Sequence, residues 1–292
     1  MAKTAPVPAR AVPPGDGARE AGFGVRERAE NFPVALWVLP PVLRRHLRAV
    51  YDVARAVDDL GDEAAGDRAK LLALFARDLA LVWTTGKPQA AVLRRLVPTV
   101  RETGLGQEPF LRLVEANRHD QRVSSYASFD DLLGYCRLSA DPVGRIVLQV
   151  LDAADDVSVA LSDRVCTALQ LLEHWQDVAE DRRAGRIYLP QADMAAYGVR
   201  PEDLDAPSSS PALRRLIAFE TERAAQLLEQ GTPLAGLLHG WGRVAVAGFV
   251  AGGRATIAAL RRPGTDVLVA TPRPRRKDLT IQLPRVLLGA LT

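Results

Sequence analysis

Three pairs of aspartates stand four residues apart in this 292-residue chain, a spacing that on a helix places both carboxylates on one face. Two carboxylates so close together can serve a hard cation such as Mg²⁺ through their oxygens. Any solvated helix face can show the same spacing, and for an isolated pair that simpler explanation is preferred. The residues around each pair must decide. The pairs are Asp58 with Asp62, Asp152 with Asp156, and Asp177 with Asp181.

The neighbouring residues separate the three pairs. "RAVDDLGDE" places Arg55 one turn before Asp58, and "QDVAEDRRAGR" follows its carboxylates with three arginines. "LDAADDVS" has no nearby cation and falls at a predicted helix end, so we expect Asp152 and Asp156 at the surface. Carboxylates for Mg²⁺ and arginines for phosphate oxygens together suit a diphosphate. We therefore predict that the first and third pairs, about 115 residues apart, face each other across a bundle cavity.

Helices must position these carboxylates, and the composition favours helix throughout. The chain is 48% hydrophobic with only 5% aromatic residues, and it contains many straight-chain helix formers. Apolar periodicity predicts a long helix from about Pro41, weakening at Gly61, and a second that begins at a Ser or Asp cap in "SDRVC" and carries the third pair. Pro142 and Gly144 interrupt a helical pattern, and a Gly- and Ala-rich helix covers residues 233–262. We predict one all-α domain over residues 23–292, after a disordered proline-rich tail over residues 1–22.

Several functional classes are disfavoured. The net charge is only +3 and no basic stripe is interleaved with aromatics, so nucleic acid is not expected as a partner. Cys136 and Cys166 lie in apolar helical patterns, which favours two small core residues over a disulfide or metal pair. The four histidines show no zinc-ligand spacing. The N-terminus lacks a signal-peptide pattern and no run of 18 apolar residues occurs, which predicts a cytoplasmic protein that does not span a membrane.

The two acidic segments together resemble the aspartate-rich motifs of the squalene and phytoene synthases, which join isoprenyl diphosphates head to head. "YDVARAVDD" is similar to the family's first-motif helix, "LLGYCRLSADPVGR" to its tyrosine–cysteine helix and the break after it, and "GGRATIAALRRPGTDVL" to its last long helix. The resemblance covers residues 31–288 in the right order. It implies an isoprenoid synthase fold, a single all-α helical bundle around a central cavity.

Within the family the chain most resembles the hydroxysqualene synthase branch of the hopanoid pathway, through "ENFPVA", "SADPVGR" and "EHWQDVAEDRRAGRIYLP". This resemblance implies Mg²⁺-dependent ionisation of presqualene diphosphate, with water capture to give hydroxysqualene and diphosphate. NADPH is then not expected, and sister enzymes of the pathway become partners.

Other activities stay open. They are condensation of two farnesyl diphosphates to presqualene diphosphate or squalene, phytoene synthesis, and a catalytically silent family member acting as an assembly partner. Squalene would require hydride from NADPH. The four intact aspartates of the two motifs argue against the silent member.

The resemblance also implies roles for individual residues. The Mg²⁺ ligands would be Asp58, Asp62, Asp177 and Asp181, with Asp59 and Glu180 as supporting acids. Three tyrosines would line the cavity, the first two with catalytic roles: Tyr51, Tyr135 and Tyr188. The substrate's diphosphate end would be closed or contacted by Asn31, Phe32, Arg55, Gln170 and Arg186. Glu173 joins this substrate-binding group, although it stands where many members carry an asparagine. Asp141 likewise replaces the branch's usual asparagine, and Gly252 stands where phytoene synthases usually show a tyrosine.

The C-terminal segment "PRPRRKDLTIQLPRVLLGALT" combines basic residues with an apolar end. One interpretation is a surface helix packed on the domain. The other is peripheral contact with an anionic membrane, at the inner face, where a thirty-carbon product must go. The basic residues are Arg273, Arg275, Arg276, Lys277 and Arg285.

Overall fold

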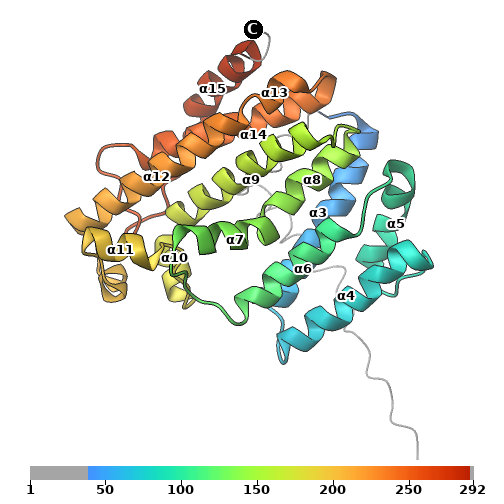
Figure 1. The fold of residues 1–292 in the computed structure, drawn as a ribbon, viewed down its shortest axis with the longest axis horizontal. Coiled ribbons are helices and arrows are strands. Elements are labelled where there is room, and N and C mark those ends of the chain that lie inside the picture. The colour runs from blue at the N-terminus through green and yellow to red at the C-terminus, as the bar shows by residue number, and fades with distance from the viewer. Residues whose placement is uncertain (1–38, 290–292) are drawn as a thin grey trace, which may run out of the picture.

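The computed structural model describes residues 39–289, and within this range the chain is built from helices (Figure 1). A single bridge pair joins Ser125 to Ile187. The prediction of an all-helical protein is confirmed for these residues, whereas the predicted tail over residues 1–22 lies outside them. The elements are α3 (Pro41–Asp62), α4 (Arg68–Thr84), α5 (Ala91–Thr103), α6 (Glu108–Asp120), α7 (Phe129–Ser139), α8 (Asp141–Val150), α9 (Asp156–Gln176), α10 (Val178–Arg183), α11 (Gln191–Tyr197), a 3₁₀ helix η1 (Pro201–Asp205), α12 (Pro211–Gly231), α13 (Leu234–Leu237), α14 (Gly240–Leu260) and α15 (Arg276–Gly289).

Helix α3 begins at Pro41 as the sequence predicts, because proline suits the first turn, where its missing N–H is not needed. Its buried stripe includes Val50, Val53 and Val57, spaced to face the neighbouring helices α5 and α6. Gly61 lies near the end of the helix, as expected. The helix continues to Asp62, and Gly61 is buried against the side chain of Asn117 on α6.

Helix α9 differs from its prediction at both ends. It begins at Asp156, earlier than expected, because the Asp155 carboxylate caps it by accepting from the Val157 and Ser158 N–H groups. It ends at Gln176, since Asp177 leaves the helical conformation (φ −103°, ψ 19°) before α10 starts. The prediction that one helix carries both Asp177 and Asp181 is therefore wrong. The Asp181 N–H still donates to the Asp177 carbonyl at 2.8 Å, which keeps the two residues one turn apart.

The interruption near Pro142 is confirmed, but Gly144 is not part of it. Helix α7 ends at Ser139, and α8 runs through Gly144 without a break. A Cβ atom at Gly144 would overlap Ser162 Oγ and lie 2.6 Å from Cys166 Sγ, so glycine here lets α8 pack closely on α9. Neither cysteine is in a disulfide, as expected.

The glycine-rich helix predicted over residues 233–262 is interrupted. Leu238 and His239 are extended and separate α13 from α14. In the described part of the chain, α14 alone is long and apolar enough to cross a membrane by length and composition, and 67% of that apolar window is buried inside the protein. Such burial is typical of the core helix of a globular domain.

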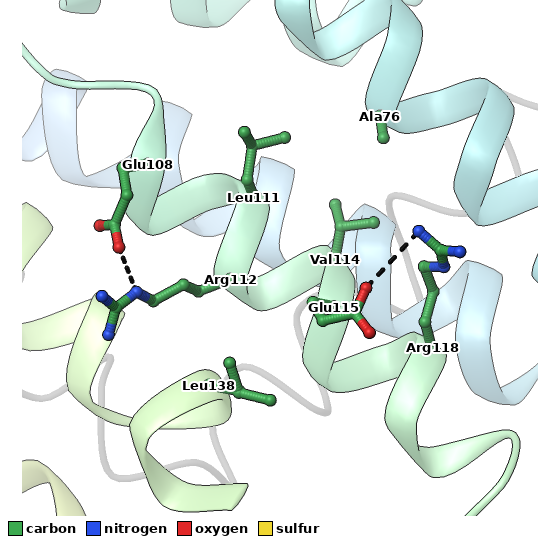
Figure 2. A pocket seen from close by; sticks show the side chains of 8 residues that line it. All are labelled: Ala76, Glu108, Leu111, Arg112, Val114, Glu115, Arg118 and Leu138. Atoms are coloured by element: carbon green, nitrogen blue, oxygen red, sulfur yellow. Dashed lines mark hydrogen bonds and ion pairs between the residues drawn. The ribbon is translucent and has the colours of Figure 1, made fainter. Parts of the chain in front are cut away.

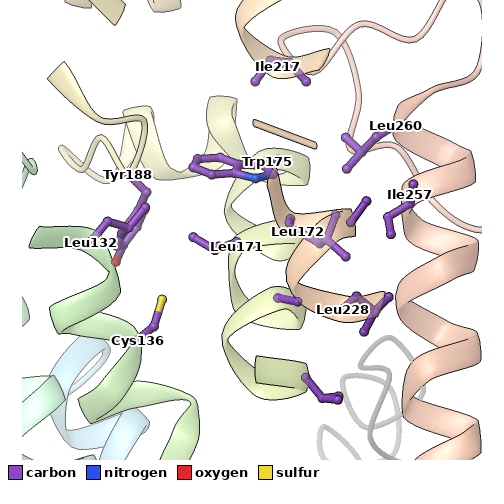
Figure 3. Close-up of a cluster of buried hydrophobic side chains, with 14 of the residues drawn as sticks. Leu132, Cys136, Leu171, Leu172, Trp175, Tyr188, Ile217, Leu228, Ile257 and Leu260 are labelled. Carbon is purple, nitrogen blue, oxygen red and sulfur yellow. The ribbon is translucent and has the colours of Figure 1, made fainter. Parts of the chain in front are cut away.

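Two hydrophobic clusters hold the helices together. One gathers α3, α4, α5 and α6 around fully buried Leu72, Leu79 and Phe110. The other surrounds α9. In the view of Figure 3, Trp175 of α9 lies between Leu132 and Tyr188 on one side and Leu260 of α14 on the other. Helix α8 contributes to both clusters, since Ile146 belongs to the first and Leu148 to the second. The predicted site residues lie on helices from both hydrophobic clusters.

The C-terminal segment forms α15, which packs on α14 with Val286 buried (Figure 1). The surface-helix interpretation is confirmed to that extent. Ile281 and Leu288 are exposed, and the described basic side chains Arg273, Arg275, Lys277 and Arg285 are exposed as well. Membrane contact through this segment stays a prediction.

Candidate active site

The structure brings the two acidic segments together through Arg186. Its guanidinium donates to Asp62 Oδ1 at 2.6 Å, joining residues 124 positions apart in the chain. Arg186 follows α10 and Asp62 ends α3, so the contact fixes the end of the first segment beside the second. Burial raises the pKa of Asp181 and of Asp120, and the positive charge of Arg186 offsets part of that rise at both carboxyls. The bond thus brings Asp62 near the second segment, while the prediction that the two aspartate pairs face each other across a cavity stays a prediction.

The first segment presents Asp58 next to α6. Its Oδ1 accepts a hydrogen bond of 3.1 Å from Asn117 Nδ2. The carboxylate remains accessible to water, yet desolvation by the surrounding protein raises its pKa to about 6, with further contributions from Asp62 and Asp59. Arg55 opposes this rise, and it forms ion pairs with Asp59 at 3.1 Å and with Glu63 at 3.7 Å. The site thus concentrates negative charge that Arg55 offsets only in part.

The second segment gathers four acids around the break between α9 and α10. Desolvation raises the pKa of Asp181 to about 7, helped by the negative charges of Asp177, Glu173 and Glu180. Asp177 has a raised pKa for the same two reasons, burial and Glu180, while a hydrogen bond from Thr271 opposes the shift. Glu173 is exposed, and its negative charge contributes to the raised pKa of Asp181.

These carboxylates fit a divalent cation by their chemistry. Desolvated carboxylates that repel one another are stabilised by a nearby cation, and oxygen donors are what Mg²⁺ prefers. Within residues 39–289, no three Asp, Glu, His or Cys side chains are grouped closely enough to hold an ion by themselves. Mg²⁺ commonly takes one or two carboxylates and completes its octahedron with phosphate oxygens and water, so pairs of carboxylates suffice.

An aromatic wall lies beside the acids. The rings of Tyr188 and His174 stack with centroids 3.7 Å apart, and Tyr135 lies 5.7 Å from Tyr188. The Tyr135 hydroxyl donates to Asp120 Oδ2 at 2.7 Å. Tyr126 joins the wall 5.6 Å from Tyr135. Two of the three predicted tyrosines are therefore buried next to the acidic segments.

Three polar residues at the site were not predicted from the sequence. Asn117 and Asp120 lie on α6, where "EANRHD" shows no spacing that marks a site. Burial raises the pKa of Asp120 to about 6. His174 is buried with its Nδ1 3.9 Å from Asp181 Oδ2, and desolvation lowers its pKa to about 3, so its imidazole is neutral. The sequence signal that could have identified His174 as a site residue was its position inside the motif "EHWQD".

The remaining predicted residues have different surroundings. Tyr51 is half-buried on α3, two turns before Asp58 on the same side of the helix. Gln170 Nε2 lies 3.4 Å from His174 Nε2. Asp141 is buried and accepts from the Thr167 hydroxyl at 2.8 Å, away from the acidic segments. Asn31 and Phe32 lie outside the described residues.

Of a small cavity and a surface groove, only the cavity is lined by residues of this site. A cavity of about 10 Å³, enough for roughly one water molecule, lies among His174, Asp181, Arg186 and Tyr188. A surface groove of about 370 Å³ runs over α6 between α4 and α7 (Figure 2). None of the predicted site residues lines the groove, whose walls carry the ion pairs Arg112–Glu108 and Arg118–Glu115. The smaller cavity, and not the groove, belongs to the acidic site.

The raised pKa of Asp181 makes stability depend on pH. Its side chain is 23% exposed and its folded-state pKa of about 7 lies above the ordinary aspartate value, so the folded protein binds this proton more tightly than the unfolded chain does. The stabilising effect of protonation is complete below about pH 4 and is lost as pH rises through 7. We expect Asp181→Asn to melt several degrees above the wild type at about pH 8, with the difference shrinking towards about pH 5.

Melting temperatures of both proteins in Mg²⁺-free buffer across this range check the expectation. Taking the difference between variant and wild type removes the opposing titration of the buried histidines. A difference that stays constant over the range would show that Asp181 titrates normally.

Comparisons with known proteins show which proteins this chain resembles. The family model for squalene/phytoene synthase matches residues 25–282. A hydroxysqualene synthase of Rhodopseudomonas palustris is 37% identical over 222 residues, covering 75% of this chain and 74% of the relative, and one of Zymomonas mobilis is 34% identical over 221 residues, covering 74% and 73%. The crystal structure of squalene synthase HpnC from Alicyclobacillus acidocaldarius superposes with a TM-score of 0.77 at 41% identity, covering 84% of this chain and 93% of that one. A dehydrosqualene synthase, 23% identical, shares the fold with a TM-score of 0.83 over 93% of this chain and 95% of its own.

Proposed function

Because this chain belongs to the squalene/phytoene synthase family and has its helical isoprenoid synthase fold, we propose that it is the enzyme that ionises presqualene diphosphate and adds water to give hydroxysqualene and diphosphate. The family's enzymes act on isoprenoid diphosphates, and the relatives from Rhodopseudomonas palustris and Zymomonas mobilis are hydroxysqualene synthases. Among the squalene, phytoene and hydroxysqualene activities of the family, the similarity to these two relatives favours the last.

The observation that supports this function best is the contact between Arg186 and Asp62. It places a guanidinium between two sets of carboxylates, on α3 and on the α9–α10 break. A diphosphate needs both signs of charge around it, cations for its oxygens and carboxylates for the metal that accompanies it. Arg186 sits where it can exchange part of its bond to Asp62 for a phosphate oxygen.

We assign the metal to the carboxylates of Asp58, Asp62, Asp177 and Asp181. When bound there, Mg²⁺ would neutralise the diphosphate and make it a better leaving group. Asp59 and Glu180 stand beside these four and add negative charge to the same region. Arg186 and Arg55 would bind the phosphate oxygens directly, and their fixed positions require no reorganisation as charge develops on the leaving group.

The aromatic wall would protect and guide the cation that ionisation leaves on the hydrocarbon. The faces of Tyr188, Tyr135 and Tyr126 can stabilise positive charge without attacking it, because burial keeps the tyrosine hydroxyls protonated and raises their pKa. His174 is neutral and stacked on Tyr188, which keeps that ring in place. Water is the nucleophile in this proposal, and the oxygen of the product comes from it.

The proposal is tested by giving the purified protein presqualene diphosphate or farnesyl diphosphate, each with and without Mg²⁺ and NADPH. We expect Mg²⁺-dependent release of diphosphate from presqualene diphosphate, with hydroxysqualene as the product whether or not NADPH is present. In ¹⁸O-labelled water the alcohol should carry the label.

Other outcomes identify the alternatives. Squalene formed only with NADPH would assign squalene synthase activity, and presqualene diphosphate formed from farnesyl diphosphate would assign the condensation step. Absence of turnover together with absence of Mg²⁺-dependent binding of diphosphate would contradict an enzymatic role. Cosedimentation of the full chain with anionic vesicles, compared with neutral ones, tests the predicted membrane contact separately.

A further inference from the structure

Asn117 of α6 is inserted against α3 beneath the first acidic motif. Its side chain is buried, and its Nδ2 donates to Asp58 Oδ1 at 3.1 Å. Gly61 provides the space. A Cβ atom at position 61 would overlap Asn117 Oδ1 and lie 2.9 Å from Asn117 Cγ. Because residues 58 and 61 share a face of the helix, the missing side chain at 61 admits the amide that reaches Asp58.

Further hydrogen bonds hold this arrangement from the α6 side. Asn117 Nδ2 also lies 3.3 Å from the carbonyl of Leu113. Gln121 Nε2 donates to the carbonyl of Gly61 at 3.0 Å and to that of Asn117 at 3.1 Å. Two amide side chains, Asn117 on α6 and Gln121 directly after it, therefore tie this helix to the end of α3. The position of Asn117 is determined by packing and by bonding at the same time.

The amide of Asn117 donates to Asp58 without neutralising its charge. A lysine or arginine beside Asp58 would neutralise it, whereas a neutral N–H group orients the carboxylate and leaves its full negative charge for a cation. The bond uses one oxygen of Asp58, so Oδ2 remains for another partner. We propose that Asn117, seated by Gly61, is a positioning residue that holds Asp58 for the metal-bound diphosphate. This inference rests on the proposed function, in which Asp58 is a metal ligand.

The test measures binding of inorganic diphosphate with Mg²⁺ by calorimetry, together with kcat and KM for presqualene diphosphate. Asn117→Leu keeps a side chain of similar size and removes the donor. We expect its affinity for Mg²⁺ and diphosphate to fall about tenfold or more, since the lost bond is to a charged group, and kcat to fall with it. Gly61→Ala should cause a similar loss, because its methyl group displaces the Asn117 side chain.

A double variant separates positioning from packing. In Gly61→Ala/Asn117→Ala the two overlapping amide atoms of residue 117 are gone and its Cβ atom lies 3.2 Å from the new methyl group, so a small shift relieves the clash. We expect the double variant to recover most of the melting temperature that Gly61→Ala loses, but none of the lost affinity. Gly248→Ala is the matched control. It lies within α14 with nothing near its Cβ position, so it should bind like the wild type and melt no lower, since alanine favours the helix over glycine.

The outcomes distinguish this inference from its premise. Variants at Asn117 that fold and bind Mg²⁺ and diphosphate within about twofold of the wild type would overturn the positioning role. Recovery of affinity in the double variant would also overturn it, because packing alone would then explain the loss. If Asn117→Leu fails to fold, Asn117→Ala, which adds no volume, gives the same readout. A wild-type protein without turnover contradicts the proposed function instead.

Discussion

Alanine at Asp58 or at Asp177 is expected to lower kcat/KM for presqualene diphosphate by about a thousandfold, with helical content unchanged. Each substitution removes one carboxylate from a segment where desolvation and like charges already raise pKa values, a condition that a bound cation relieves. The effect is large because charge must be stabilised at the leaving diphosphate as its bond breaks, and no other described side chain duplicates these positions. Steady-state kinetics, with circular dichroism to check the fold, measure the effect.

The chain contains its own control for this experiment. Asp156 belongs with Asp152 to the second pair, which has the same four-residue spacing, but it is exposed at the start of α9. Asp156→Ala should retain activity within about twofold, because surface substitutions away from a site change little. Full activity in both Asp58→Ala and Asp177→Ala would show that the metal site is elsewhere.

Replacing Arg186 with glutamine is expected to lower kcat/KM by about a hundredfold. The change removes a direct phosphate ligand in the proposed mechanism and the 2.6 Å ion pair that holds Asp62 beside the second acidic segment. It also removes the positive charge that lowers the pKa of Asp181 and of Asp120, so more of these carboxylates would be protonated near neutral pH. KM should therefore rise as kcat falls, and the loss should be greatest at low pH.

Arg182→Gln is the matched control for this second experiment. Arg182 lies four residues earlier and pairs with exposed Asp205 at 2.6 Å, outside the acidic site. Its loss should leave kcat/KM within about twofold of the wild type. Arg186→Lys should restore part of the activity, since it keeps the charge and loses the planar geometry. Equal effects of the glutamine variants at 182 and 186 would contradict a specific role for Arg186.

Local patterns in the sequence determined much of this protein. The apolar stripe of α3 and the proline at its start predicted that helix correctly, and with it the positions of Asp58 and Asp62. Neighbouring arginines separated the two candidate metal-binding aspartate pairs from the exposed pair of Asp152 and Asp156. Motif order along the chain indicated the family. These features depend on helix periodicity and on chemistry within a few residues, which a single sequence displays directly.

Tertiary structure alone decided which residues meet around those motifs. The break at Asp177, the insertion of Asn117 over Gly61, the bond from Tyr135 to Asp120 and the stacking of His174 on Tyr188 all join residues across different helices or across a helix boundary. A glycine in a helix looks like a weakness in the sequence and becomes a docking position only when a neighbouring helix fills its space. The physical reason is that helix periodicity specifies a face, whereas the partner of that face depends on how all the helices pack at once.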